Sequence, residues 1–157
     1  MKLSRSLCAA ILVGVLVSFA GGCSSAKNAE GRTVAEASRA VAVRPGVEKG
    51  HVELRNYKSG FTSRWGVDVY FTPSTDADLS NDTSLLRDLL RIGWSVSDHR
   101  IEGGVTLVLD DSKGANLANA ARSAGIPPFE NNKALPEELT VSSREMTRSF
   151  GEWPGVN

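Results

Sequence analysis

Two histidines and several carboxylates are the side chains of this sequence whose types suit acid–base chemistry. His51 and Asp68 fall on the two strands of a predicted hairpin, and a histidine beside a carboxylate can act as a general base. A triad would need a nucleophile as well, and Ser63 falls on the opposite face of the predicted strand. An exposed cross-strand pair contributing about 0.2–1 kcal/mol is the alternative, which we favour.

A second set of acidic residues hints at a divalent cation. Asp98, His99 and Glu102 lie beside a glycine-rich stretch, while Asp110 and Asp111 close the following strand. These groups lack the alternating ligand spacing of calcium loops, and Asp residues before a helix usually serve as turn and cap residues. Two histidines at unrelated positions also make a poor metal centre. We therefore predict no metal site and no cofactor.

Aromatic and cationic side chains form the third set. On the solvent side of the predicted hairpin they make a mixed surface suited to contact with a protein or glycan. Trp65 and Trp94 are predicted to point into the core instead. The residues of the predicted binding surface are His51, Arg55, Tyr57, Arg64, Asp68 and Tyr70.

Motifs of the common enzyme classes do not occur in the chain. The phosphate-binding, dinucleotide-binding, zinc-protease and serine-hydrolase patterns are all missing. One Ser-x-x-Lys match, Ser24 to Lys27, lies in a segment too flexible to hold a nucleophile beside its base. We predict no catalytic residue and a non-enzymatic protein.

Alternating hydrophobic residues over 47–57 and 61–72 predict the hairpin that carries the first site. A two-residue turn at Ser59-Gly60 connects the strands, because glycine supplies a positive φ. This turn predicts four cross-strand pairs: Leu54–Trp65, Val52–Val67, His51–Asp68 and Arg55–Arg64.

Helical spacing and capping residues predict the remaining elements. Thr33 and Glu36 match a capping box at the start of the first helix, Gly93 is expected to end the second, and Ser142 or Ser143 is expected to cap the last. Four helices are expected, over 33–43, 83–92, 116–124 and 144–150. A second hairpin is expected over 94–109, turning at Glu102-Gly103-Gly104. The predicted fold class is α+β, with two layers: a four-stranded antiparallel sheet built from two hairpins, and helices mainly on one face. Residues 33–157 form one domain with an irregular C-terminal tail.

The N-terminus has the features of an export signal. Lys2 and Arg5 precede an apolar run over 7–20, and small residues precede Cys23. The run is shorter than the roughly 20 apolar residues that span a bilayer. An ordinary cleaved signal and an uncleaved anchor remain the alternatives to the interpretation that follows.

Ala20-Gly21-Gly22-Cys23 resembles the lipobox of bacterial lipoproteins, although Ala20 stands where leucine is more frequent. The resemblance implies that residues 1–22 are a signal peptide and that Cys23 receives a diacylglyceryl group. Residues 23–32 would then be the lipidated cysteine and a flexible tether. The mature chain is also similar to small actinobacterial lipoproteins of unknown function, through its Leu-rich and Ala-rich helices and its terminal Phe-Gly-x-Trp-Pro-Gly.

Charge and cysteine content exclude several classes. Removal of residues 1–22 takes away Lys2, Arg5 and Cys8, which leaves 16 basic residues against 18 acidic ones. That balance disfavours a nucleic-acid partner. With Cys23 lipidated, no thiol would remain for a disulfide or a nucleophile.

These observations predict an extracytoplasmic protein that is held at the cell membrane by a lipid on Cys23. Its predicted function is to bind an envelope protein or polymer such as a glycan. Two alternatives remain: a small envelope hydrolase that uses carboxylates such as Asp68 or Asp110, and a structural spacer.

Overall fold

The computed structural model describes residues 31–79, 83–111, 116–126 and 135–154 of the chain, apart from the side chain of Ser59. The predicted signal peptide, Cys23 and most of the tether lie outside these ranges. Within them, none of the helices has the length and apolar character needed to cross a bilayer.

Four helices and four strands make up the described part of the chain, which confirms the α+β class. Their order is α1 (Val34–Ala42), β1 (Val47–Ser59), β2 (Thr62–Pro73), α2 (Thr83–Trp94), β3 (Ile101–Leu109), α3 (Leu117–Ser123), β4 (Glu138–Val141) and α4 (Ser143–Phe150).

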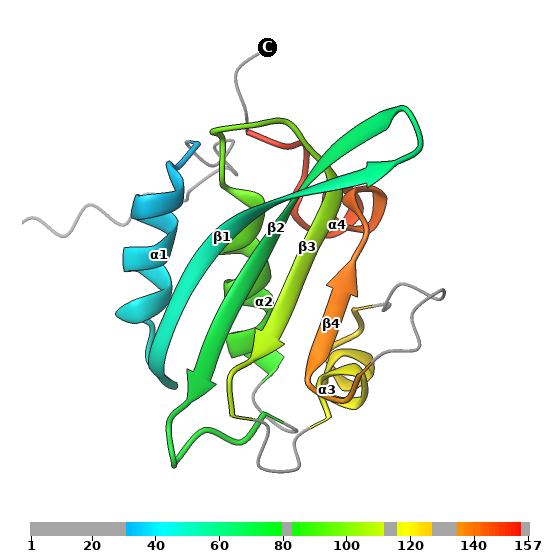
Figure 1. Cartoon of the computed structure of the whole chain (residues 1–157). Coiled ribbons are helices and arrows are strands. Elements are labelled where there is room, and N and C mark those ends of the chain that lie inside the picture. Colours follow the sequence, from blue (N-terminus) through cyan, green and yellow to red (C-terminus); the bar gives the residue numbers. More distant parts are fainter. Residues whose placement is uncertain (1–30, 80–82, 112–115, 127–134, 155–157) are drawn as a thin grey trace, which may run out of the picture.

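The strands form one mixed sheet in the order β1-β2-β3-β4 (Figure 1). The pairs β1–β2 and β3–β4 are antiparallel, whereas β2 and β3 are parallel. Parallel neighbours need a crossover connection, and the segment that contains α2 supplies it. The prediction of a purely antiparallel sheet is therefore wrong, although the number of strands is right.

The second hairpin is the element that the prediction got wrong. Trp94 belongs to α2, and residues 101–109 form one strand that continues through Gly103 and Gly104. Gly104 has a φ of 85°, and a Cβ there would lie 2.1 Å from the carbonyl oxygen of Val141. This glycine therefore permits the close approach of β4, a strand that falls where an irregular tail was predicted.

The first hairpin is confirmed, but its turn lies one residue later than predicted. Ser59 pairs with Thr62 around Gly60-Phe61, so that Val52 lies opposite Val69 and His51 lies opposite Tyr70. The pairing is shifted by two residues from the predicted one. Because side chains alternate with a period of two, the shift leaves every side chain on its predicted face.

The core lies where the helices meet the sheet. Val67, Val69 and Phe71 of β2 are fully buried, as are Val105 and Leu107 of β3. The stripe of α2 that packs among them consists of Leu85, Leu86, Leu89, Leu90 and Trp94. In Figure 1, α2 and α4 lie behind the strands, and α1 lies beside β1.

The ends of the domain are tied to one loop, residues 95–100. Arg32 forms a short parallel bridge with Val96, and its backbone N–H donates to the Ser95 carbonyl at 2.7 Å. The Trp153 indole donates to the Val96 carbonyl at 2.8 Å. The tether was predicted to extend to residue 32, but Arg32 is part of the folded domain.

Candidate functional site

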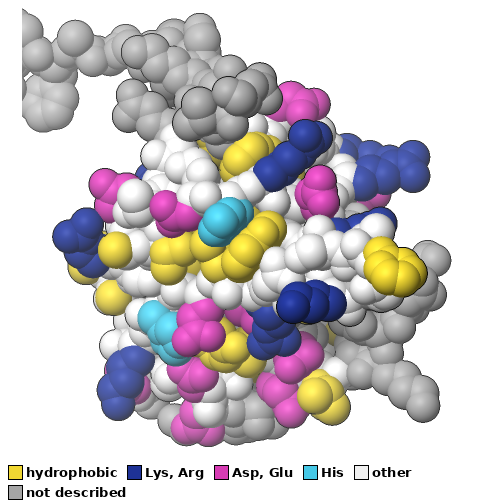
Figure 2. Space-filling model, turned by 45° about the horizontal axis from the view of Figure 1, so that its top comes forward, with side chains coloured by type: hydrophobic (Ala, Val, Ile, Leu, Met, Phe, Trp, Pro, Cys, Tyr) yellow, Lys and Arg dark blue, Asp and Glu magenta, His cyan; other side chains and the backbone are white. Residues whose placement is uncertain are grey.

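The predicted binding surface lies on the sheet face turned away from α2 and α4 (Figure 1). His51, Glu53 and Arg55 alternate with buried Val52 along β1 and are exposed. Their neighbours on β2 include Tyr70, which is half-buried, and Asp68, which is fully buried. Figure 2 shows apolar, acidic and basic side chains interspersed over this side of the molecule, with the two histidines well apart.

Asp68 is the centre of an interaction network on this face. Its Oδ2 lies 2.5 Å from Nη2 of Arg55, and its Oδ1 accepts a 3.3 Å hydrogen bond from the Tyr57 hydroxyl. The same Arg55 nitrogen donates to the Tyr70 hydroxyl at 3.2 Å. His51 stacks on Tyr70, with ring centroids 4.7 Å apart. We call these five residues the Asp68 cluster.

Two glycines support the aromatic part of the cluster. A Cβ on Gly66 would lie 2.6 Å from Cε2 of Tyr57, and one on Gly103 would lie 3.4 Å from its Cδ2. The Tyr57 ring therefore rests on bare backbone of β2 and β3, and the Arg55 guanidinium lies 5.8 Å from the centre of the ring. Packing and charge together hold Tyr57 and Arg55 in fixed positions.

Burial sets the ionisation of the cluster. It raises the pKa of Asp68 above its usual value; Arg55 and Tyr57 oppose this effect, while Glu138 and Glu53 add to it. Burial and the neighbouring carboxylate also raise the pKa of Tyr57. Desolvation is the strongest single effect and works against the charge of Arg55, but the Asp68 carboxylate, Tyr70 and Tyr57 together outweigh it, so the pKa of Arg55 is raised.

The Asp68 side chain has no exposed surface, which limits what it can do chemically. A general base or nucleophile must come within about 3 Å of the reacting atom. The Arg55 guanidinium forms an ion pair with Oδ2, which accepts no hydrogen bond from the described residues, and Tyr57 donates to Oδ1, so both oxygens are covered. Asp68 is therefore placed to orient its two neighbours, and the exposed groups are the ones available to a partner.

The structure brings five of the six predicted surface residues together and leaves Arg64 outside the network. Arg64 is exposed and lies opposite Tyr57, closer to the hairpin tip. The predicted pairing of His51 with Asp68 is wrong, because Glu53 takes the position opposite Asp68. His51 lies 3.4 Å from Glu53 instead.

Sequence reasoning missed the contribution of the other two strands to this face. Thr106 of β3 is buried, and its hydroxyl lies 3.1 Å from that of Thr140 on β4. Glu138 also acts on Asp68 from β4. The alternation of side chains along β3 could have placed Thr106 on this face, but β4 itself was not predicted.

The suggested cation ligands do not form a cluster. Asp98 caps α1 by accepting a 2.6 Å hydrogen bond from the Val34 N–H, and His99 stacks on Trp65 with centroids 4.1 Å apart. Asp110 lies at the other end of β3 from Glu102. Among the described residues, no group of three or more potential ligands could hold a metal ion.

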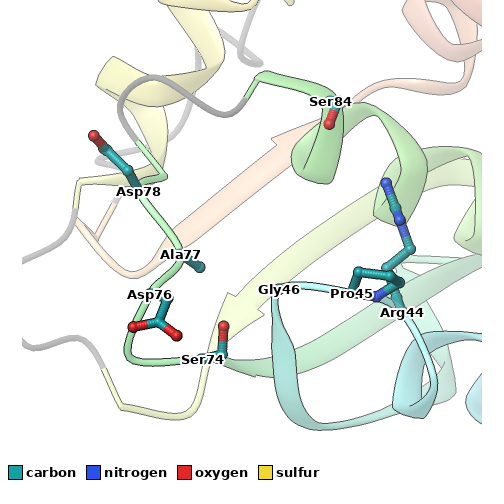
Figure 3. Close-up of a pocket in the computed structure, with 8 residues that line it drawn as sticks. All are labelled: Arg44, Pro45, Gly46, Ser74, Asp76, Ala77, Asp78 and Ser84. Atoms are coloured by element: carbon teal, nitrogen blue, oxygen red, sulfur yellow. The ribbon is translucent and has the colours of Figure 1, made fainter.

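Two hollows lie away from the Asp68 cluster. One, of about 740 Å³, is lined by Trp94, Asp98, His99, Glu102, Arg144 and Trp153, among others. The other, of about 830 Å³, lies between the α1–β1 turn and the loop after β2 (Figure 3). Arg44 in the second hollow is engaged by Asp88, so that its charge is already balanced.

Comparisons of the chain with family models, curated proteins and solved structures find no significant match. The case for a function therefore rests on the sequence signal at Cys23 and on the geometry of the sheet face.

Proposed function

We propose that this protein is an extracytoplasmic lipoprotein that is anchored through Cys23 and binds an envelope protein or polymer through the open face of its sheet. The proposal includes a two-layer arrangement in which the helices cover mainly one face. The observation that carries it is the Asp68 cluster, in which a buried carboxylate holds exposed aromatic and cationic groups in place.

Preorganisation is the physical reason to favour binding. Ordering a long side chain on association costs about 0.5–1.5 kcal/mol, and a side chain that is already fixed avoids much of that cost. Arg55 and Tyr57 are fixed by Asp68, and Tyr70 by contacts with Arg55 and His51. Such a surface suits a partner that offers carboxylates, hydroxyls or aromatic groups.

A carboxylate hydrolase is less well supported, because its catalytic group must reach a substrate in a cleft. Asp68 is covered, and it lines neither of the two hollows described above. A plain spacer would not need a buried charge beneath a surface of ordered aromatic residues.

A two-part experiment in the producing bacterium tests the proposal. We expect Cys23→Ala to release the chain from membranes or to stall its processing, whereas the control Cys8→Ala leaves both unchanged. Membrane association and mature mass that are unaffected by Cys23→Ala would contradict the lipid anchor.

The second part replaces an exposed residue with a photo-crosslinking amino acid, either His51 on the sheet face or Arg39 on α1. We expect a discrete adduct with an envelope protein, or retention on cell-wall polymer after irradiation, from position 51 and not from position 39. Arg55→Glu should abolish it. Equal yields from both positions would refute binding through this face.

A further inference from the structure

The tip of the β1–β2 hairpin exposes the most accessible large apolar side chain in the described part of the chain. Phe61 occupies the second turn position, and its relative exposure of 111% means that no other residue covers it. Burying a phenylalanine side chain contributes about 1.5–3 kcal/mol, which the isolated domain does not gain here. A single exposed apolar residue is common, but this one is accompanied by exposed cations and lies at the end of the molecule where the tether begins.

The charges around Phe61 are all positive. Between Glu53 and Asp68 the sequence contains Arg55, Lys58 and Arg64 but no acidic residue. Arg55 is engaged by Asp68. Lys58 and Arg64 are exposed, and neither makes an ion pair with any residue that the structure describes. The tip therefore presents an apolar ring and two exposed cations that have no ion-pair partner among the described residues.

A second feature is the place where the tether leaves the domain. The N-terminal end of α1, which follows Arg32, lies at the same end of the molecule as the hairpin tip, at the top of Figure 1. The nine residues from Cys23 to Gly31 are separated by eight residue steps, which reach at most about 28 Å when extended. A domain of this size has a radius of gyration of about 14 Å and a diameter of about 35 Å. A lipid on Cys23 would therefore keep this end near the bilayer.

We propose, on the basis of the lipid anchor proposed above, that the hairpin tip formed by Lys58, Gly60, Phe61 and Arg64 contacts an anionic lipid bilayer. The phenyl ring enters the interface between headgroups and acyl chains, and the two cations contact lipid phosphates. The contact between the tip and the bilayer is weak by itself. The lipid anchor makes it intramolecular, because it holds the tip near the bilayer at an effective concentration in the millimolar range. That concentration is enough to populate the contact.

Two points of attachment have a consequence for the sheet. A tether alone lets the domain rotate, whereas a tether and a hairpin tip at one end fix its axis. The strands of β1 and β2 then run away from the bilayer, and the face with the Asp68 cluster is directed sideways, where partners in the envelope can reach it.

The test uses the full chain, processed and lipidated in the producing bacterium and reconstituted into vesicles. One variant carries Phe61→Cys and the control carries Val43→Cys. Val43 is 79% exposed and lies at the C-terminal end of α1, away from the tip. Each new cysteine is labelled with an environment-sensitive fluorophore. Vesicles contain phosphatidylcholine alone or with phosphatidylglycerol, and a doxyl lipid serves as quencher.

We expect a blue shift and strong quenching at position 61 but not at position 43, with the larger effect in anionic vesicles. Lys58→Glu or Arg64→Glu should each lower the bound population about fivefold or more. Equal quenching at the two positions in a chain that floats with the vesicles would overturn the hairpin contact alone. Signals that do not depend on phosphatidylglycerol would overturn its selection by charge.

The wild-type chain shows separately whether Cys23 carries a lipid. Wild-type chain with a lipidated Cys23 has no thiol to label and floats with the vesicles. If the wild-type chain takes up the label or stays at the bottom of the gradient, the lipid anchor is wrong, and the inference that rests on it is wrong as well.

Discussion

Replacing Arg55 with glutamine tests whether Asp68 organises the sheet face. The substitution leaves a fully buried carboxylate without its cation. Loss of one partner of a fully buried pair costs about 3–5 kcal/mol. The Arg55 side chain is 51% exposed, and water screens such a charge, so we expect a loss of about 1–3 kcal/mol in the free energy of unfolding at neutral pH.

The pH dependence follows from the direction of the pKa shift. The pKa of Asp68 is raised in the folded protein by burial, so its contribution to stability is complete below its unfolded pKa and is lost as the pH rises through its folded pKa. Arg55→Gln removes the charge that opposes this effect. Its cost should therefore be largest at high pH, where Asp68 carries its charge, and should shrink as the pH falls and the carboxyl group takes up its proton.

Urea unfolding followed by tryptophan fluorescence measures these costs. A double-mutant cycle with Asp68→Asn isolates the pair, and Arg55→Gln should cost less than about 0.5 kcal/mol in that background. Arg64→Gln is the matched control, since it removes an exposed cation of the same face with an expected effect within about 0.5 kcal/mol. A cost for Arg55→Gln that is equal in both backgrounds, or that does not change with pH, would refute the role of Asp68.

Two further substitutions test how the elements around the face are built. Thr33→Ala removes the hydroxyl that accepts from the Glu36 N–H and donates to the Glu36 carboxylate, while the backbone N–H of residue 33 keeps its bond to Glu36. We expect the substitution to cost about 0.5–2 kcal/mol in unfolding experiments; an unchanged midpoint would show that the hydroxyl adds nothing. Gly104→Ala places a Cβ 2.1 Å from the Val141 carbonyl oxygen at a positive φ, so we expect loss of the β3–β4 pairing, seen as faster amide exchange in β4. Gly103→Ala is the milder control, and equal effects of the two would argue against this packing.

Periodicity was sufficient to predict the helices and the first hairpin. Thr33 and Glu36 form the predicted capping box, and Ser142 caps α4 as one of its two predicted caps. The four strands were predicted in number, and the faces of β1 and β2 were right despite the shift in pairing. Local signals of this kind depend on residues within one or two turns of each other, which a single sequence contains.

Glycine accounts for most of what the sequence did not predict. Gly93 was interpreted as the end of a helix, but a Cβ there would lie 2.7 Å from Val105 and 2.9 Å from Val69. It lets α2 approach the sheet, and Trp94 continues the helix. Gly103 and Gly104 were interpreted as a turn, although they serve contacts with Tyr57 and β4. A glycine required by a distant neighbour looks the same in sequence as one required by a turn.

The network around Asp68 could not be predicted from the sequence for a related reason. The six residues predicted for the binding surface, five of which form the cluster, lie on one face of the hairpin. The burial of Asp68, however, depends on Arg55 and Tyr57 packing over it. The sequence gives the alternation and not the depth of each position. The glycines beneath Tyr57 and the contribution of β4 both come from the arrangement of β2, β3 and β4 in space.

The two edges of the sheet offer little free backbone to a partner, which favours binding through the face of the sheet. Exposed strand edges attract partners because their N–H and C=O groups are free to pair. The Ser38 hydroxyl of α1 accepts from the Val52 N–H at 2.9 Å and donates to the Val52 carbonyl at 3.3 Å, in the middle of β1. At the other edge, β4 has only four residues. Side chains such as Arg55 and Tyr70 are then what the sheet offers to a partner, so the binding proposed above should depend on their identity and not on backbone pairing.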